Sequence, residues 1–292
     1  MNKRFNLMIL MAGAAALAAG GNDTIHEDYG AVEVTASAPT ITKEFTTTDG
    51  LVVKYDRFLV SMTAISISAS DTQVVTTSAT PQIFDAVAPA PTTLLSDVVR
   101  RAQPWDSFTF QIAPAVESED AAITLAEAVK ESDRDLMTKG GFSVYLEAKA
   151  TKEGVTKTMK WGFTTDTSFS ECEGERGGVK VKGIIIPPDG TESVDLAFRG
   201  DVLFSDDLSA PGVGLRFDTL AAADTDMNGE ITLEELTATT LDVARAFGPY
   251  GTAEEKDITD LGAFTGVLTR NIVASFREKG SCVAAPTPAA TP

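Results

Sequence analysis

Apolar and polar residues alternate along much of this chain between residues 31 and 200. The clearest alternating runs cover residues 32–35, 63–68, 108–112, 142–149, 158–163 and 194–199. A period of two is typical of strands with one buried and one solvated face, as in antiparallel sheets. Turn dipeptides that end in glycine separate strand candidates at 49–50, 153–154 and 189–190. The pattern predicts an antiparallel β-sandwich domain over residues 31–205.

Beyond residue 206 the apolar spacing becomes helical. Apolar residues recur at intervals of three and four around 217–221, 233–247 and 261–276. The last of these predicted helices is marked by Leu261, Phe264, Val267, Leu268, Ile272 and Phe276. One or two short helices are also predicted within 118–138. The fold class is therefore predicted to be mainly β with a C-terminal helical region over 206–281, and the Ala- and Pro-rich tail 282–292 is predicted to be flexible.

The N-terminus has the pattern of a secretory signal peptide over residues 1–18. Lys3 and Arg4 precede an apolar stretch, and Ala16-Leu17-Ala18 offers a cleavage site. The segment resembles a lipoprotein lipobox, but Gly21 stands where the lipidated cysteine would be. No apolar run is long enough for a stable transmembrane span. We expect a mobile linker over 19–30 and an exported protein in the periplasm, on the cell envelope surface or outside the cell.

Residues 224–235 read DTDMNGEITLEE, which fits the calcium-loop pattern D-x-[DN]-x-[DN]-G-x5-E. Gly229 stands at position 6, where the loop turns sharply. The predicted metal ligands are the side chains of Asp224, Asp226, Asn228 and Glu235, the backbone carbonyl of Glu230 and, through a water, Thr232. The segment resembles an EF-hand. That resemblance implies Ca²⁺ as the bound ion and a helix on either side of the loop.

Two other interpretations of this loop are weighed. A surface turn rich in Asp, Asn and Gly that binds nothing does not explain a glutamate at position 12, and a dockerin repeat would carry Asp there in a duplicated loop. EF-hands usually occur in pairs, and residues 257–260 lack the glycine and spacing of a second loop. An unpaired extracellular site is expected to bind calcium with a dissociation constant of roughly 10⁻⁴ to 10⁻³ M, which suits a structural role.

Charge and composition restrict the partners and the chemistry. The chain carries a formal charge of −18, which disfavours nucleic acid and anionic membranes as partners. His26 is the only histidine, so nucleophilic triads and histidine-based zinc hydrolases are excluded. Cys172 and Cys282 either pair, as an oxidising compartment allows, or stay independent thiols. Asp201, Asp206 and Asp207 form a possible second cation site, although helix capping also accounts for part of that group.

The β-region also resembles the methanobactin-associated family of periplasmic copper-binding proteins. The resemblance lies in the order of segments 52–61, 108–112, 141–147 and 161–163. It implies a β fold and an envelope location, but not copper chemistry, because that family's ligands include histidine and these segments contain none. The chain as a whole resembles uncharacterised bacterial envelope lipoproteins with one EF-hand, a resemblance that implies no activity.

Three functions follow from these patterns. The first is an exported, non-enzymatic calcium-binding protein in which Ca²⁺ orders the junction between the helical region and the β-sandwich. The second is a ligand-recognition or metal-homeostasis module with a cleft lined by Trp105, Trp161 or Tyr145, which would take an envelope protein or a small molecule as its partner. The third is a carboxylate-dependent hydrolase, which needs two facing carboxylates about 5 to 10 Å apart. No spacing singles out such a pair, and the acidic cluster of Glu171, Glu173 and Glu175 is most simply interpreted as a solvated loop after a strand.

Overall fold

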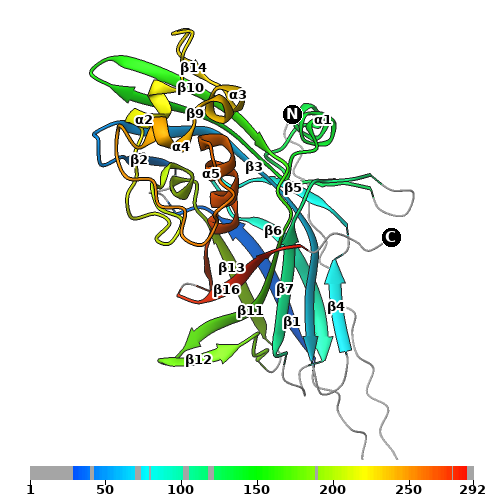
Figure 1. Cartoon of the computed structure of the whole chain (residues 1–292). Helices are drawn as coiled ribbons and strands as arrows, with labels where there is room; N and C mark the ends of the chain where they lie inside the picture. Colours follow the sequence, from blue (N-terminus) through cyan, green and yellow to red (C-terminus); the bar gives the residue numbers. More distant parts are fainter. Residues whose placement is uncertain are drawn as a thin grey trace, which may run out of the picture.

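A computed structural model describes residues 29–39, 43–69, 74–78, 80–100, 105–117, 122–187, 190–277 and 279–287. The predicted signal peptide, nearly all of the predicted linker and the end of the predicted tail lie outside these ranges. Within them the fold is mainly β, as the alternation predicted; its strands form two sheets, and the helical part is smaller (Figure 1). No helix in the described ranges has the length and hydrophobicity needed to cross a membrane.

The larger sheet is built around one long strand, β3. Its central order is β12-β11-β7-β3-β9-β10-β14; β2, β4 and β5 also pair with β3, β16 pairs with β11, and β8 pairs with β5. The bounds are β2 (Glu44–Thr46), β3 (Val52–Ala69), β4 (Val74–Ser78), β5 (Gln82–Asp85), β7 (Ser107–Ile112), β8 (Thr124–Leu125), β9 (Val144–Lys152), β10 (Val155–Phe163), β11 (Thr167–Arg176), β12 (Val179–Lys182), β14 (Glu230–Ile231) and β16 (Ser281–Pro286). β3 spans 18 residues and bends at a register shift between Thr63 and Ser66, so successive segments of it meet different partners.

The smaller sheet has the order β15-β13-β1-β6. Its strands are β1 (Tyr29–Ser37), β6 (Thr92–Arg100), β13 (Thr191–Phe198) and β15 (Val273–Phe276). β1 and β13 pair in parallel, with Val34 opposite Val194. The prediction of a wholly antiparallel β-region is therefore wrong at this pair, and also at β5 and β8, which pair in parallel. Because most of the larger sheet separates β1 from β13 in sequence, a long crossover joins them, and a crossover permits parallel pairing whereas a tight turn does not.

The two sheets share one hydrophobic core. Phe84 of β5 lies 5.2 Å from Phe198 of β13 between ring centroids, and Phe108 of β7 lies 4.9 Å from Phe276 of β15. All four rings are fully buried. Apolar side chains on alternate positions of both sheets thus pack against each other.

The helical elements are short, and some of them are separated along the chain by strands. They are α1 (Glu131–Gly140), η2 (Asp201–Phe204), α2 (Asp218–Ala222), α3 (Leu233–Ala238), α4 (Leu241–Ala244), α5 (Leu261–Leu268) and η3 (Thr269–Asn271). The helix predicted over 261–276 ends at Leu268, and its last residues form β15. Val273 and Phe276 fit a strand as well as a helix, and pairing with β13 decides between them.

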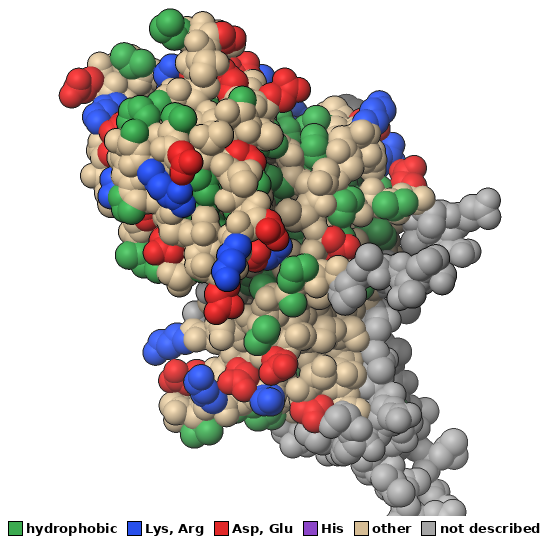
Figure 2. Space-filling model, in the orientation of Figure 1, with side chains coloured by type: hydrophobic (Ala, Val, Ile, Leu, Met, Phe, Trp, Pro, Cys, Tyr) green, Lys and Arg blue, Asp and Glu red, His purple; other side chains and the backbone are tan. Residues whose placement is uncertain are grey.

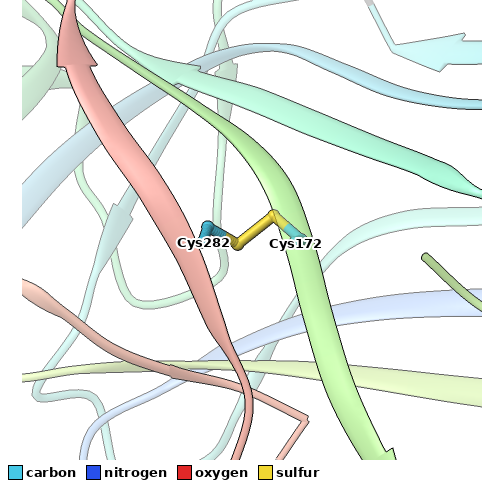
Figure 3. The surroundings of a disulfide bond; sticks show 2 residues. All are labelled: Cys172 and Cys282. Carbon is cyan, nitrogen blue, oxygen red and sulfur yellow. A yellow bond between two sulfur atoms is a disulfide. The ribbon is translucent and has the colours of Figure 1, made fainter. Parts of the chain in front are cut away.

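The prediction of a flexible tail over 282–292 is wrong for residues 282–286. Ser281–Pro286 form β16, an edge strand that pairs antiparallel with β11. Cys282 of β16 is joined to Cys172 of β11 by a disulfide, so of the two alternatives the structure shows the paired cysteines (Figure 3). The bond closes a loop of 110 residues and fixes the C-terminal strand to the larger sheet.

Phe204 joins the helical part to the larger sheet. Its ring lies 5.3 Å from Phe45, 6.4 Å from Tyr55, 5.9 Å from Trp161 and 6.0 Å from Phe217, measured between centroids. The five rings come from β2, β3, β10, η2 and the residue before α2. All of them are buried.

Asp133 connects α1 to the larger sheet. Its carboxylate accepts hydrogen bonds from the Arg57 guanidinium, at 2.5 Å for the Nη1 to Oδ1 contact, and from the backbone N–H of Lys130 at 2.8 Å. Burial alone would raise the pKa of Asp133, but the bonds from Arg57 and Lys130 outweigh it and the pKa is lowered. The charged carboxylate therefore stabilises the fold.

Asp133→Asn is expected to cost about 1 to 3 kcal/mol of unfolding free energy at pH 7, because it removes a charge-assisted hydrogen-bonded pair. A lowered pKa in the folded state means that this stabilisation is complete above the ordinary carboxyl pKa of about 4 and is lost as the pH falls through the folded value. The deficit should therefore shrink between pH 7 and pH 3 in urea unfolding. Asp135→Asn, an exposed change on the same helix, serves as the control; a deficit that is constant with pH would contradict the assignment.

Candidate metal centre

Three of the predicted ligands converge in the loop between α2 and α3. One carboxylate oxygen from each of Asp224, Asp226 and Glu235 can be chosen so that all lie within 4.8 Å of one another. Asp224 is buried, Glu235 is half-buried and Asp226 is exposed. An open hollow of about 400 Å³ beside the loop is lined in part by Asp226 and Glu235, so an ion can reach these groups from solvent. Figure 2 shows acidic side chains gathered at the end of the molecule where Figure 1 places β14 and α3.

The bend at Gly229 aims backbone N–H groups at the first acidic side chain. Gly229 has φ +86°, in the left-handed region that favours glycine. The N–H of Asn228 donates to Oδ1 of Asp224 at 3.1 Å, and the N–H of Gly229 donates to Oδ2 at 3.0 Å. The N–H of Glu230 donates to Oδ1 of Asn228 at 2.6 Å. These bonds hold the side chains at loop positions 1 and 5 toward the inside of the bend.

Glu235 both caps α3 and reaches across the loop. Its Oε2 accepts hydrogen bonds from the N–H of Thr232 at 2.9 Å and from the Thr232 hydroxyl at 3.0 Å, which completes a capping box. Capping alone therefore explains a glutamate at loop position 12, so that glutamate does not by itself argue against a turn that binds nothing. Oε1, however, accepts from the N–H of Thr225 at 3.2 Å, at the opposite end of the loop. The carboxylate of Glu235 therefore closes the loop.

The middle of the loop is paired with the larger sheet. Glu230 and Ile231 form β14, which pairs in parallel with Thr158 and Met159 of β10. Ile231 is fully buried, and its carbonyl accepts a hydrogen bond of 2.8 Å from the indole N–H of Trp161. An apolar residue at loop position 8 is consistent with this burial, but the sequence does not identify β10 as its partner.

Lys157 of β10 is part of the site and was missed by the sequence analysis. Its ammonium contacts Oδ2 of Asp224 in an ion pair. The Asp224 side chain is fully buried there, whereas that of Lys157 is 23% exposed. The bond from Lys157 is the main reason why the pKa of Asp224 is lowered. Since 67 residues separate the pair in sequence, no local spacing could have indicated it.

The other carboxylates considered for a cation site are bound elsewhere. Asp201 pairs with Arg199, and Asp206 pairs with Arg216. The Oδ1 of Asp207 accepts from the backbone N–H of Ser209 at 2.8 Å. Each of these carboxylates therefore already has a partner nearby in the sequence, at most ten residues away. The Arg199–Asp201 pair lies in the tripeptide Arg-Gly-Asp, whose charged groups thus bond to each other.

The aromatic residues proposed to line a ligand cleft are largely enclosed. Trp105 and Trp161 are 1% and 0% exposed, and Tyr145 is 7% exposed. An open pocket of about 700 Å³ lies elsewhere, and its lining includes Tyr55 and Asp85. The Oδ1 of Asp85 accepts hydrogen bonds from the N–H of Phe58 at 3.0 Å and from that of Val87 at 3.1 Å. These bonds to the backbone explain the presence of this carboxylate without a ligand.

No protein-family model, curated protein or solved structure matches this chain.

Proposed function

We propose that the chain is a non-enzymatic calcium-binding protein whose single EF-hand-like loop, residues 224–235, holds one Ca²⁺ ion. The observation that carries the proposal is the convergence of Asp224, Asp226 and Glu235 around the bend at Gly229. All the proposed donors, Asn228, Thr232 and the Glu230 carbonyl included, are oxygens. Calcium takes six to eight oxygen ligands in flexible geometry, and magnesium demands a tighter octahedron, so this set favours calcium.

The proposed role of the ion is structural. The loop runs from α2 to α3 and is paired with β10 through β14, so an ion bound within it would stiffen the junction between the helical part and the larger sheet. The second loop of an EF-hand pair would normally support such a site, and here β10 takes that place. With a dissociation constant of roughly 10⁻⁴ to 10⁻³ M, calcium at about 1 mM would add about 0.4 to 1.4 kcal/mol of stability.

We further propose that the two sheets form a β-sandwich and that the protein is exported. The close ring contacts between Phe84 and Phe198 and between Phe108 and Phe276 support face-to-face packing. The signal-peptide pattern supports export, and the disulfide between Cys172 and Cys282 is compatible with an oxidising compartment. Calcium sites of extracellular modules bind with dissociation constants of about 10⁻⁴ to 10⁻³ M, so a weak site suits an exported protein.

Calorimetric titration of the purified protein with Ca²⁺ tests the proposed function. We expect binding of one ion, with affinity at least about tenfold lower in Glu235→Gln because the variant loses a bidentate carboxylate. Glutamine still completes the capping box, so α3 keeps its N-terminus. Glu234→Gln removes the same charge from an exposed neighbour and should change the affinity less than about twofold. Binding that is equal in the wild type and Glu235→Gln would contradict the assignment.

A further inference from the structure

The proposed calcium loop already contains a positive group supplied by the sheet. The ammonium of Lys157 contacts Oδ2 of Asp224, the residue at loop position 1. Its backbone position is fixed, because the neighbouring Thr158 donates its N–H to the carbonyl of Gly229 at 2.8 Å. The β10–β14 pairing thus holds Lys157 beside the loop.

The remaining bonds of Asp224 show how its charge is balanced. Oδ1 accepts the N–H of Asn228, and Oδ2 accepts the N–H of Gly229 in addition to the ammonium. A buried carboxylate without a cation would be strongly destabilising. Among the residues that the structure describes, the basic side chain in contact with Asp224 is that of Lys157, so Lys157 supplies this cation.

A lysine ammonium and a calcium ion cannot share this carboxylate at low cost. The two oxygens belong to one group, so cations bound to both would lie within a few ångströms and repel each other around a buried carboxylate. The Lys157 side chain, being 23% exposed, has a path to solvent along its flexible stem. Its ammonium can therefore leave without a movement of β10.

We propose that Lys157 is an internal counter-ion that calcium displaces, so that Asp224 is paired with the ammonium when no ion is bound and with calcium when one is. This inference rests on the proposed function of the loop. The exchange has two consequences: it keeps the junction folded when calcium is absent, and it lowers the affinity for calcium, because each binding event must break the Lys157–Asp224 pair. The sheet thus sets the calcium concentration at which the loop is occupied.

The first test is calorimetric titration of Lys157→Gln with Ca²⁺. Glutamine removes the charge while retaining much of the length of the side chain, and we expect affinity about tenfold higher than in the wild type. Lys160→Gln is the matched control, since it removes the same charge from an exposed position on the same strand. Without calcium, Lys157→Gln should also melt at a lower temperature than Lys160→Gln, and calcium should remove that difference.

A second test needs no variant. An acylating reagent labels lysines in the wild-type protein with and without saturating Ca²⁺, and mass spectrometry measures the extent at each site. We expect labelling of Lys157 to rise with calcium and labelling of Lys160 to stay constant. Unchanged labelling of Lys157, or equal calcium affinity in Lys157→Gln and the wild type, would overturn the exchange while leaving calcium binding intact. Absence of binding heat in both proteins would overturn the proposed function and the exchange together.

Discussion

Removal of the Cys172–Cys282 disulfide is expected to lower the free energy of unfolding by about 2 to 5 kcal/mol. The bond closes a loop of 110 residues. In the chain-entropy model a loop of that length contributes nearly the upper value, because the cross-link restricts the unfolded chain. The double variant Cys172→Ala, Cys282→Ala should therefore unfold at clearly lower denaturant concentration than the wild type in guanidinium titrations.

A reductant provides the control for this experiment. It should shift the unfolding midpoint of the wild type to that of the double variant and leave the double variant unchanged. If the reduced wild type kept its original midpoint, the disulfide would contribute nothing to stability. The result also shows how much the disulfide holds β16 in place. Among the strands described, β16 pairs only with β11, and it has few buried side chains.

Phe204→Ala is the substitution expected to damage the core most. Its ring contacts those of Phe45, Tyr55, Trp161 and Phe217 and is 1% exposed. Truncating a fully buried phenylalanine leaves a cavity and costs about 3 to 5 kcal/mol. The loss should appear as a lower unfolding free energy by urea titration. It should also disturb the fluorescence of Trp161.

Phe247→Ala is the matched control for Phe204→Ala, because the Phe247 side chain is 50% exposed. The same chemical change there should cost less than about 1 kcal/mol, since much of the ring is already in water. Equal losses in the two variants would show that the ring cluster does not hold the helical part onto the sheet.

The sequence predicts the local elements of this fold better than their arrangement. The alternation over 142–149 and 155–163 with glycine at 154 predicts a hairpin, and β9 and β10 form it with Gly154 at φ +83°. The same alternation does not distinguish a parallel from an antiparallel neighbour, because the period of two is common to both. The pattern of apolar residues therefore could not predict the parallel pairing of β1 with β13.

The candidate site was predicted to a similar extent. Loop positions 1, 3 and 12 are brought together as the spacing indicated, because a glycine bend and a helix start lie within twelve residues and local bonds suffice to fold them. Lys157 and Trp161 approach the loop from another part of the chain. Their positions depend on which strand pairs with β14, which is a tertiary result.

The parallel pairing of β1 with β13 has a consequence for how the chain folds. β1 can pair with β6 early, but its parallel partner β13 is made only when nearly two thirds of the polypeptide is complete, and β15 and β16 complete the two sheets later still. Contacts between residues as distant in sequence as those of β1 and β13 slow folding, because a large loop must close before that strand pairing rewards it. We therefore expect folding in the range of seconds or slower, with both sheets completed only after residues 273–286 have been made.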